Sequence, residues 1–596
     1  GKQLYLNMAQ KFLEIRGVTY VPDGEGVMSP TYAQQHKPVA EQSEAVGHAV
    51  RATYLYSAMA DIEALTGEEK YAEALDRIWG DITNTRMHIT GGLGAVHGIE
   101  GFGSQYELPN AHAFNETCAA VGNVLFNYRM FLLHKNARYL DVAEIALLNN
   151  VLAAVNLEGN KFFYVNPLDA DGKYPFNHGT AGRAPWFGTA CCPSNMARLI
   201  PQVPGMTYAH DDGNIYITFY AESSTEIDVA GTKVKIAQST NYPNDGKISI
   251  RLDPAQSGQF RLHLRIPTWA QGEQFVPGGL YEFVDPEGAP VSLSVNGRAV
   301  EATHLEKGFV VIERDWQAGD KVELDLPMPV RANRSHPSVE ANVDRIALTR
   351  GPFVMCAEGI DNGGVTQRYF FKGESKTTEA KISTKTIDHG SFLQATITAR
   401  ALTEEGGSKA IIPLVLTPYY AWNNRDTGSM TVWFPTKPEL AIFDPLELPR
   451  ESVFAGITAS HTAGEDTVTA IGDGKVDKWS SGNKVLRWTS RGQSGKPQWV
   501  SGRFKGPKKI RSVGVFWMNR WQGDVKFPEE WSIEIEQNSK WKPFELYTTD
   551  KYATRGNQYN VVHPAAPLTC DAIRIHMTPK EDTAVGILEV SVEFEE

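Results

Sequence analysis

The chain has 596 residues and a formal net charge of −12 at pH 7, and 42% of its residues are hydrophobic. This length predicts three or four domains, and the composition is typical of a soluble globular protein. Lysine and arginine form no block along the sequence, and no apolar run reaches the length of a membrane span, which argues against a nucleic-acid partner and against a membrane-spanning protein. Five cysteines in so long a chain do not form a disulfide framework.

Residues 1–208 have apolar side chains at helical spacing. The helices that this spacing predicts are Leu4–Ile15, Ala45–Leu65, Tyr71–Thr83, Cys118–Leu133, Tyr139–Val155 and one further helix after Pro193. A long glycine-rich loop lies at 84–117. Loops of this length are usually functional or disordered, and we expect this one to pack over the mouth of a helical domain.

From about residue 209 the apolar pattern changes to the period of two that β-strands show. Strands are predicted at Asn214–Tyr220, Lys247–Leu252, Phe260–Ile266, Val291–Val295, Phe309–Arg314 and Lys321–Leu326. We expect a β-sandwich over 209–334. A second β-sandwich is expected over 335–450, with strands at Arg345–Thr349, Phe353–Ala357, Gln394–Arg400 and Ser429–Phe434.

Residues 457–596 resemble a discoidin-type β-sandwich, the coagulation factor 5/8 C-domain. The resemblance rests on Ile457-Thr-Ala-Ser460, Ile471-Gly-Asp473-Gly474 and Asp477-Lys-Trp479 followed by Trp488, with strands expected at Ile510–Trp517 and Ile587–Val592. Modules of this type commonly bind glycans through loops at one end. A carbohydrate-binding module and a structural cap are therefore both open for this region.

Three of the five cysteines lie in two short segments, close to carboxylates in the sequence. Glu116 and Cys118 are two residues apart, and Cys191 and Cys192 are adjacent. Three thiolates and one carboxylate can fill a tetrahedral zinc shell. The spacing is not that of a zinc finger, so a metal here would do more than fold a small module. On spacing alone, buried structural cysteines remain an alternative, whereas a vicinal disulfide fits the required geometry poorly.

Around these residues the sequence resembles the β-L-arabinofuranosidases of glycoside hydrolase family 127. The resemblance covers roughly residues 1–450 and is carried by Val46-Gly-His48-Ala-Val-Arg51, Tyr106-Glu107-Leu-Pro-Asn110, Asn115-Glu116-Thr-Cys118, Phe163-Tyr164-Val-Asn-Pro167 and Ala190-Cys191-Cys192-Pro193-Ser-Asn195. It implies a multidomain α + β protein, in which an (α/α)6-barrel catalytic domain is followed by β-sandwich domains. Such a barrel has twelve helices, whereas six or seven are predicted here, so we expect a partial barrel without its first half.

The resemblance also implies a retaining glycosidase with a cysteine nucleophile. Its zinc ion would be held by Glu116, Cys118, Cys191 and Cys192. Cys191 would attack the sugar, and Glu100 would be the general acid/base. A zinc-bound thiol loses its proton, which suits a nucleophile. Glu107 and Glu41 are alternatives for the acid, although charged loop residues are usually only solvated.

Three residues are candidates for substrate binding. His48 and Tyr164 match residues that contact the sugar in the family, although a lone helical histidine is otherwise more often a satisfied core residue. Trp186 precedes the second cysteine segment, and its ring can stack on a sugar or simply pack.

The expected activity is exo-hydrolysis of terminal β-L-arabinofuranosides in plant-derived oligo- or polysaccharides. One alternative keeps the mechanism but acts on another L-furanoside of pectin, such as aceric acid, with Arg183 as the nearest cation for its carboxylate. The other alternative is a non-catalytic glycan-binding protein with structural zinc. The oligomeric state is open. The sequence begins without a signal peptide, but such segments are removed, so the compartment is open too: periplasm or secretion is favoured, with the cytoplasm as the alternative.

Overall fold

The computed structural model describes residues 2–22, 29–97, 99–111, 113–229, 231–372, 380–403, 408–442, 453–464, 466–472, 487–518, 524–556 and 559–594. The chain forms two compact units. The first comprises Gly1–Leu402 and Ser408–Phe443, and the second comprises Thr403–Gly407 and Asp444–Glu596. Each unit is treated by itself.

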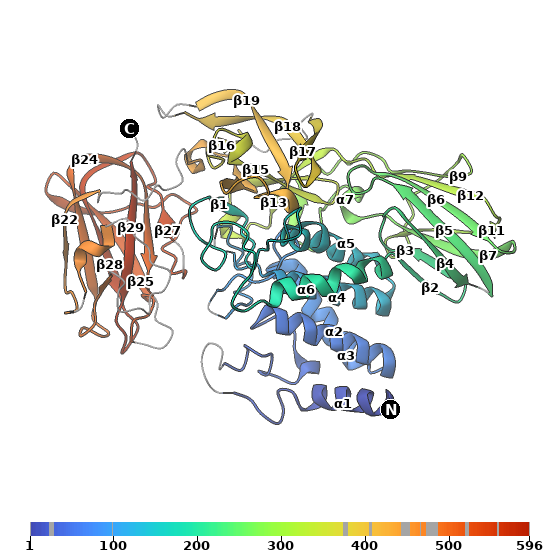
Figure 1. Ribbon diagram of the computed structural model, residues 1–596. Coiled ribbons are helices and arrows are strands. Elements are labelled where there is room, and N and C mark those ends of the chain that lie inside the picture. The colour runs from blue at the N-terminus through green and yellow to red at the C-terminus, as the bar shows by residue number, and fades with distance from the viewer. Residues whose placement is uncertain are drawn as a thin grey trace. The chain divides into compact units, whose positions relative to one another are not determined.

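The first unit begins with a helical region. Its α-helices are α1 (Lys2–Ile15), α2 (Ala49–Thr66), α3 (Glu69–Asp81), α4 (Thr117–His134), α5 (Ala137–Ile145) and α6 (Cys191–Leu199), shown in Figure 1. The helices α3 and α5 each run on into a π-helical turn, η3 (Ile82–Arg86) and η4 (Ala146–Val151), and two 3-10 helices are η2 (Val39–Glu41) and η5 (Ile200–Met206). Every helix that the apolar spacing predicts is therefore confirmed.

Helices α2 and α4 pack closely because small residues face each other. A Cβ atom added to Gly122 of α4 would lie 2.0 Å from Thr53 Oγ1 of α2, so only glycine allows this approach. Beside this contact the rings of Tyr56 and Phe126 are 5.6 Å apart, and both side chains are fully buried. This contact fixes the N-terminal ends of the two helices, where the candidate site residues lie.

Two sheets follow the helices, one antiparallel and one mixed. The six-stranded sheet has the order β10-β9-β12-β6-β5-β4, and the four-stranded sheet has the order β11-β7-β3-β2, in which β3 and β7 are parallel. Figure 1 shows the two sheets layered against each other. Their bounds are β2 (Tyr208–Asp211), β3 (Asn214–Ile217), β4 (Ser223–Val229), β5 (Thr232–Thr240), β6 (Lys247–Pro254), β7 (Gly258–Arg265), β9 (Ser292–Val295), β10 (Arg298–Val300), β11 (Phe309–Trp316) and β12 (Asp320–Asp325). A short helix, α7 (Thr268–Gln271), follows β7.

The remaining sheet of the first unit has eleven strands, with the main order β16-β18-β19-β15-β14-β13-β8, and is separate from these two sheets in Figure 1. Its strands are β1 (Asp169–Asp171), β8 (Tyr281–Phe283), β13 (Val330–Ser335), β14 (Arg345–Arg350), β15 (Phe353–Glu358), β16 (Tyr369–Phe370), β17 (Lys381–Ile387), β18 (Gly390–Leu402), β19 (Ser408–Pro418), β20 (Ser429–Thr431) and β21 (Trp433–Pro435). The strand β1 comes from the helical region and pairs with β20. This pairing ties the helical region to the sheet.

A buried ion cluster joins the helical region to the four-stranded sheet. Arg265 of β7 is fully buried and contacts Glu144 and Asp141 of α5, the latter at 2.7 Å. The Tyr242 hydroxyl donates to Glu144 Oε1 at 2.8 Å. Each buried charge thus has a partner of opposite sign, as a buried charge requires.

The second unit contains an eight-stranded antiparallel sheet with its own apolar core. Its strands are β22 (Phe454–Ala459), β23 (Trp488–Thr489), β24 (Gln498–Trp517), β25 (Glu530–Gln537), β26 (Lys540–Pro543), β27 (Tyr559–Val562), β28 (Leu568–Thr578) and β29 (Gly586–Phe594). The strands expected at Ile510–Trp517 and Ile587–Val592 are present within β24 and β29. The motif residues Asp473-Gly474 and Asp477–Trp479, which carry part of the discoidin-type resemblance, lie outside the described residues. The discoidin-type assignment stays a prediction.

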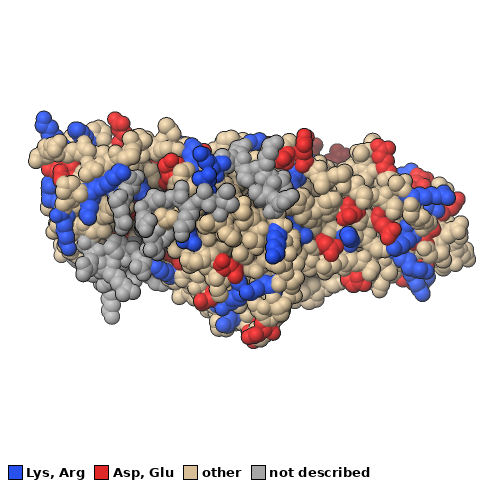
Figure 2. Space-filling model, turned by 90° about the horizontal axis from the view of Figure 1, so that it is seen from above, with Lys and Arg blue, Asp and Glu red and all other residues tan. Residues whose placement is uncertain are grey.

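Charges of both signs are mixed on the face that Figure 2 shows, where lysine, arginine, aspartate and glutamate are interspersed among other residues.

Within the described ranges, no helix combines the length and the apolar character needed to cross a membrane.

Candidate active site

The N-terminal ends of α4 and α6 bring the predicted metal ligands together. Glu116 immediately precedes α4 and Cys118 lies in its first turn, whereas Cys191 and Cys192 are the first two residues of α6. One ligand atom from each of these four residues lies within 4.8 Å of all the others. We call these residues the thiol–carboxylate cluster. Because a helix N-terminus carries partial positive charge, both helices favour anionic side chains at this point.

The cluster is mostly buried, and one thiol is the exception. Glu116, Cys118 and Cys192 are at most 2% exposed, whereas Cys191 is half-buried. The Sγ atoms of Cys118 and Cys192 are 3.5 Å apart, and those of Cys191 and Cys192 are 3.9 Å apart, so all three cysteines are free thiols. Glu116 Oε1 lies 3.7 Å from the Sγ atoms of both Cys191 and Cys192. The vicinal disulfide is therefore excluded in this structure.

The electrostatics of the cluster select Cys191 as the thiolate. Hydrogen bonds from the Cys118 and Cys192 thiols lower the pKa of Cys191 well below its usual range. Burial raises the pKa of Cys192 and that of Glu116, and the nearby Cys191 charge raises the pKa of Glu116 further. The half-buried thiol thus carries the negative charge, and a thiolate is the nucleophilic form of cysteine.

Tyr164 reaches the cluster through a short β-bridge. Glu116 pairs with Val165, and the Thr117 N–H donates to the Tyr164 carbonyl at 3.0 Å. On the other side, Asn177 Oδ1 accepts the Tyr164 N–H at 2.8 Å. This framework places the Tyr164 hydroxyl 3.3 Å from Cys191 Sγ, and burial raises the pKa of the hydroxyl, so it stays protonated and can donate to the thiolate.

Glu100 and His48 form a pair beside Glu116. A Cβ atom on Gly101 would lie 2.2 Å from the Gly47 carbonyl oxygen, so glycine is needed for the loop to approach α2. The carboxylate Oε2 of Glu100 lies 3.3 Å from His48 Nε2. His48 also caps α2: its Nδ1 accepts the Arg51 N–H at 3.4 Å, so the ring proton sits on Nε2 and points to Glu100. Ligand atoms of His48, Glu100 and Glu116 again lie within 4.8 Å of one another.

Other candidates occupy different surroundings. Glu107 accepts the Ser104 N–H at 2.9 Å, which commits its carboxylate to the loop, and Glu41 lies in η2 on the surface. Trp186 is 63% exposed, so its ring is available to a ligand from solvent. Arg183 is buried and donates to the carbonyls of Ala153, Trp422 and Tyr420, so its guanidinium is committed to backbone.

Sequence reasoning missed the residues that surround Tyr164. The His178 ring centroid lies 4.3 Å from that of Tyr164, and the Phe187 ring lies 5.6 Å from it. His178 has a left-handed backbone with φ of 48°. The flanking Asn177 and Gly179 are the sequence signal for a turn at His178. This signal does not predict that the His178 ring lies against Tyr164.

Three family models match consecutive parts of the chain. Their descriptions are β-L-arabinofuranosidase, GH127 catalytic domain, at residues 1–205; β-L-arabinofuranosidase, GH127 middle domain, at 214–328; and glycoside hydrolase family 127 C-terminal domain, at 330–435. A non-reducing end β-L-arabinofuranosidase of Bifidobacterium longum is 31% identical over 470 residues, which cover 73% of this chain and 68% of that protein. The chain belongs to glycoside hydrolase family 127.

Solved structures agree with the family assignment. A GH127 β-arabinofuranosidase aligns with a TM-score of 0.68 at 42% identity, over 74% of this chain and 66% of that one. A GH127 β-L-arabinofuranosidase from Geobacillus stearothermophilus T6 aligns with a TM-score of 0.66 at 34% identity, over 73% and 69% of the two chains. The matched part therefore spans about two thirds of these GH127 relatives. The multidomain architecture, with a helical catalytic domain followed by β-sandwich domains, is confirmed.

Proposed function

We propose that the chain is a retaining exo-glycoside hydrolase that removes terminal β-L-arabinofuranosyl residues, with Cys191 as nucleophile and Glu100 as general acid/base. The observation that carries the proposal is the juxtaposition of a half-buried Cys191 thiolate with the Glu100–His48 pair around the Glu116 carboxylate. The identity of the sugar is inferred from the GH127 relatives, which are β-L-arabinofuranosidases.

The thiol–carboxylate cluster fits a zinc ion held by Glu116, Cys118, Cys191 and Cys192. Glu116 Oε2 is buried and has no hydrogen-bond partner among the described residues, which leaves it available to a cation. Buried polar atoms in proteins rarely lack a hydrogen-bond partner or a bound ion. Three sulfur ligands and one carboxylate oxygen are a zinc donor set. When bound, zinc would keep the thiols deprotonated and lower the charge density on Cys191.

In the first step Cys191 Sγ attacks the anomeric carbon while Glu100 donates its proton to the departing glycosidic oxygen. The sugar is then linked to Cys191 with inverted configuration. His48 Nε2–H holds the Glu100 carboxylate in place. Tyr164 donates a hydrogen bond that orients Cys191 Sγ.

In the second step Glu100, now ionised, takes a proton from a water molecule. The water oxygen attacks the anomeric carbon and Cys191 leaves as a thiolate, so the product regains the configuration of the substrate. The hydrogen bonds that lower the pKa of Cys191 make the thiolate a better leaving group. Trp186 is proposed to stack on the sugar or on the group that follows it, since its ring faces solvent.

The alternative substrate with a carboxylate, such as aceric acid, receives no support from Arg183, because its donors are used on backbone carbonyls. A purely structural zinc site is disfavoured because Cys191 keeps exposed surface and contacts the Tyr164 hydroxyl.

We further propose the domain division expected from the sequence, with a helical catalytic domain over 1–208, β-sandwiches over 209–334 and 335–450, and a module over 457–596 that binds carbohydrate. Two strands from before residue 335, β8 and most of β13, pair within the eleven-stranded sheet and so join the first β region to the second. The separate apolar core of the second unit supports an independent module. A plant glycan as the natural substrate follows from the proposed activity.

The test is the hydrolysis of an aryl β-L-arabinofuranoside, followed by proton NMR to read the configuration of the first product. We expect β-L-arabinofuranose to appear first and Cys191→Ser to reduce turnover by more than 10³-fold. A first product of α configuration, or a Cys191→Ser variant with more than about a tenth of the wild-type rate, refutes the cysteine nucleophile.

A further inference from the structure

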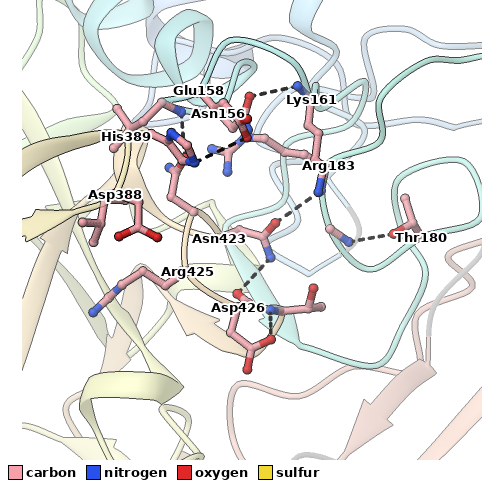
Figure 3. Close-up of a pocket in the computed structure, with 15 residues that line it drawn as sticks. Asn156, Glu158, Lys161, Thr180, Arg183, Asp388, His389, Asn423, Arg425 and Asp426 are labelled. Carbon is pink, nitrogen blue, oxygen red and sulfur yellow. Dashed lines mark hydrogen bonds and ion pairs between the residues drawn. The ribbon is translucent and has the colours of Figure 1, made fainter.

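A polar cavity is lined by residues other than those of the thiol–carboxylate cluster. It has a volume of about 600 Å³, and four separate segments line it: 156–161, 180–183, the turn 387–389 between β17 and β18, and the loop 423–427 (Figure 3). This volume is within the usual range of small-molecule sites. We propose that this cavity is an accessory site for an uncharged oligosaccharide, a segment of the glycan whose terminal sugar is removed at Cys191. The identity of the glycan rests on the proposed function.

The walls of the cavity are joined by hydrogen bonds between the separate segments, so the site is formed before a ligand arrives. Asn424 Oδ1 accepts the Leu157 N–H at 2.8 Å and joins two of the segments. Asn423 Oδ1 accepts the Arg183 N–H at 3.2 Å and joins a third. A preformed site loses less conformational entropy when it binds a ligand.

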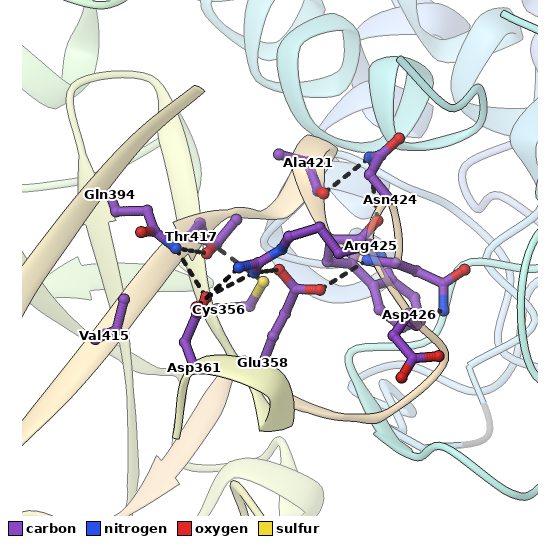
Figure 4. A network of polar contacts seen from close by, with 12 residues as sticks. Cys356, Glu358, Asp361, Gln394, Val415, Thr417, Ala421, Asn424, Arg425 and Asp426 are labelled. Atoms are coloured by element: carbon purple, nitrogen blue, oxygen red, sulfur yellow. Dashed lines mark hydrogen bonds and ion pairs between the residues drawn. The ribbon is translucent and has the colours of Figure 1, made fainter. Parts of the chain in front are cut away.

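The loop 423–427 is anchored by the charged network that Figure 4 shows. Arg425 donates to both oxygens of Asp361, at 2.8 and 2.6 Å, and to Glu358 Oε2 at 2.6 Å. Glu358 also accepts the Asn423 N–H at 2.9 Å. The Arg425 guanidinium is therefore directed into the sheet and serves to position the loop, not to bind a ligand.

The groups left to face a ligand are of mixed character. Arg183 is not one of these groups, because its guanidinium donates to backbone carbonyls. Lys161 and Asp388 are exposed, and neither has an ion-pair partner among the residues that the structure describes. Glu158 Oε2 lies 3.8 Å from His389 Nε2, so these two lining residues face each other. Asp426 Oδ1 accepts the Thr427 N–H at 2.7 Å, which leaves its other oxygen for a ligand. One ammonium donor and several carboxylate acceptors suit vicinal hydroxyl groups, which both donate and accept.

Two other ligand classes fit the cavity less well. An anion would meet the carboxylates of Asp388, Asp426 and Glu158, with Lys161 as the available cation. A metal ion needs ligand atoms that converge, and within the described ranges the groups of three or more His, Cys, Asp or Glu atoms within 4.8 Å are those at Glu116. An uncharged polyhydroxylated ligand is the class that remains.

The cavity wall and the thiol–carboxylate cluster are contacted by two adjacent residues, Phe163 and Tyr164. Tyr164 directs its hydroxyl to Cys191, whereas the ring of the preceding residue, Phe163, packs 4.3 Å from the Arg183 guanidinium in the cavity wall. The cavity is thus separate from the site of cleavage, and its loss should leave the chemistry intact.

The experiment measures the binding of arabinotetraose, an uncharged oligosaccharide of four L-arabinose units, by isothermal titration calorimetry. The full chain carries Glu100→Gln so that the sugar is not consumed. Two cavity variants are compared: Lys161→Ala/Asp388→Ala, which removes polar partners, and Thr427→Trp, which fills space. The matched control is Asp228→Ala/Lys233→Ala, an exposed pair on the β4–β5 hairpin. We expect both cavity variants to lose at least tenfold in affinity for arabinotetraose and the control to lose less than twofold.

The same substitutions in the otherwise wild-type chain separate this inference from the proposed function. Hydrolysis of the aryl β-L-arabinofuranoside should change less than twofold. If both cavity variants bind arabinotetraose as the parent does, or if the cavity binds trigalacturonate in preference, the inference is overturned. If the wild-type chain binds arabinotetraose in a cavity-dependent way but does not cleave the aryl glycoside, the accessory site stands and the proposed activity fails.

Discussion

Replacement of Glu100 by glutamine is the sharpest test of the proposed acid/base. Glutamine has the shape of glutamate, and its amide oxygen can still accept the His48 Nε2–H that now lies 3.3 Å from Glu100 Oε2. The Glu100 side chain is 37% exposed, so the exchange removes no buried charge. The variant should therefore keep its fold and its metal content and lose only the proton that Glu100 transfers.

The magnitude depends on the leaving group. General acid catalysis contributes about 10²–10⁴-fold, which corresponds to roughly 3–5 kcal/mol of transition-state stabilisation. In an arabinosyl disaccharide the leaving group is the second sugar, whose alkoxide is a poor leaving group, so this substrate should show the full loss in kcat/KM. In a nitrophenyl glycoside the leaving group is nitrophenolate, which departs without protonation, so formation of the glycosyl-enzyme should slow by less than about tenfold. Hydrolysis of the glycosyl-enzyme still requires a base. Added azide needs no deprotonation and should restore turnover of the aryl glycoside with formation of a glycosyl azide of retained configuration.

The matched control is Glu107→Gln, in the same loop, whose carboxylate accepts the Ser104 N–H. It should keep the rates on both substrates within about threefold. If Glu100→Gln slows the disaccharide and the aryl glycoside equally, shows no azide rescue and retains metal and fold, Glu100 is not the acid/base.

Three further predictions test the surroundings of the site. Dialysis against a chelator should remove one zinc per chain and abolish hydrolysis, with recovery on added Zn²⁺; a fully active metal-free protein would contradict the proposed donor set. Tyr164→Phe removes the hydroxyl 3.3 Å from Cys191 Sγ and should lower kcat/KM by roughly 10–150-fold, the equivalent of about 1.5–3 kcal/mol for a hydrogen bond to a charge, with metal content unchanged. Arg265→Met leaves Asp141 and Glu144 buried without a cation and should lower the free energy of unfolding by about 3–5 kcal/mol in urea titrations, whereas Arg261→Met, at an exposed ion pair, should lower it by less than about 1 kcal/mol.

Local periodicity was sufficient to predict the helices and about half of the strands in the described part of the first unit, and longer strands such as β5 (Thr232–Thr240) and β19 (Ser408–Pro418) were missed. Apolar spacing identified α2 and α4, because both bury residues along much of their length. It could not indicate the π-helical turns at the ends of α3 and α5, since these depend on how the helices meet their neighbours. The strand β1 has three residues and no alternating pattern, and it is defined by its pairing with β20, far along the chain.

The candidate site was predictable in its members and not in its arrangement. The residues of the thiol–carboxylate cluster were identified through two short motifs, and the structure brings them together as the family resemblance implies. Their geometry depends on contacts between distant segments, such as the bridge from Glu116 to Val165. The polar cavity could not be found from the sequence at all, because its four walls share no motif and meet only in the folded chain.

The structure also gives a physical reason for proposing Cys191, of the three clustered cysteines, as the nucleophile. Cys118 and Cys192 are both at most 2% exposed, so their sulfur atoms can serve a buried metal but cannot meet a sugar in solvent. Cys191 is half-buried, stands at the first position of α6 and receives hydrogen bonds from the two buried thiols and from Tyr164. The helix N-terminus and these donors stabilise a thiolate at the one position that substrate can reach. Burial therefore singles out Cys191, among the proposed ligands, as the sulfur that can also meet a sugar. Exchange of Cys191 should abolish the reaction even where the remaining three ligands still hold the metal.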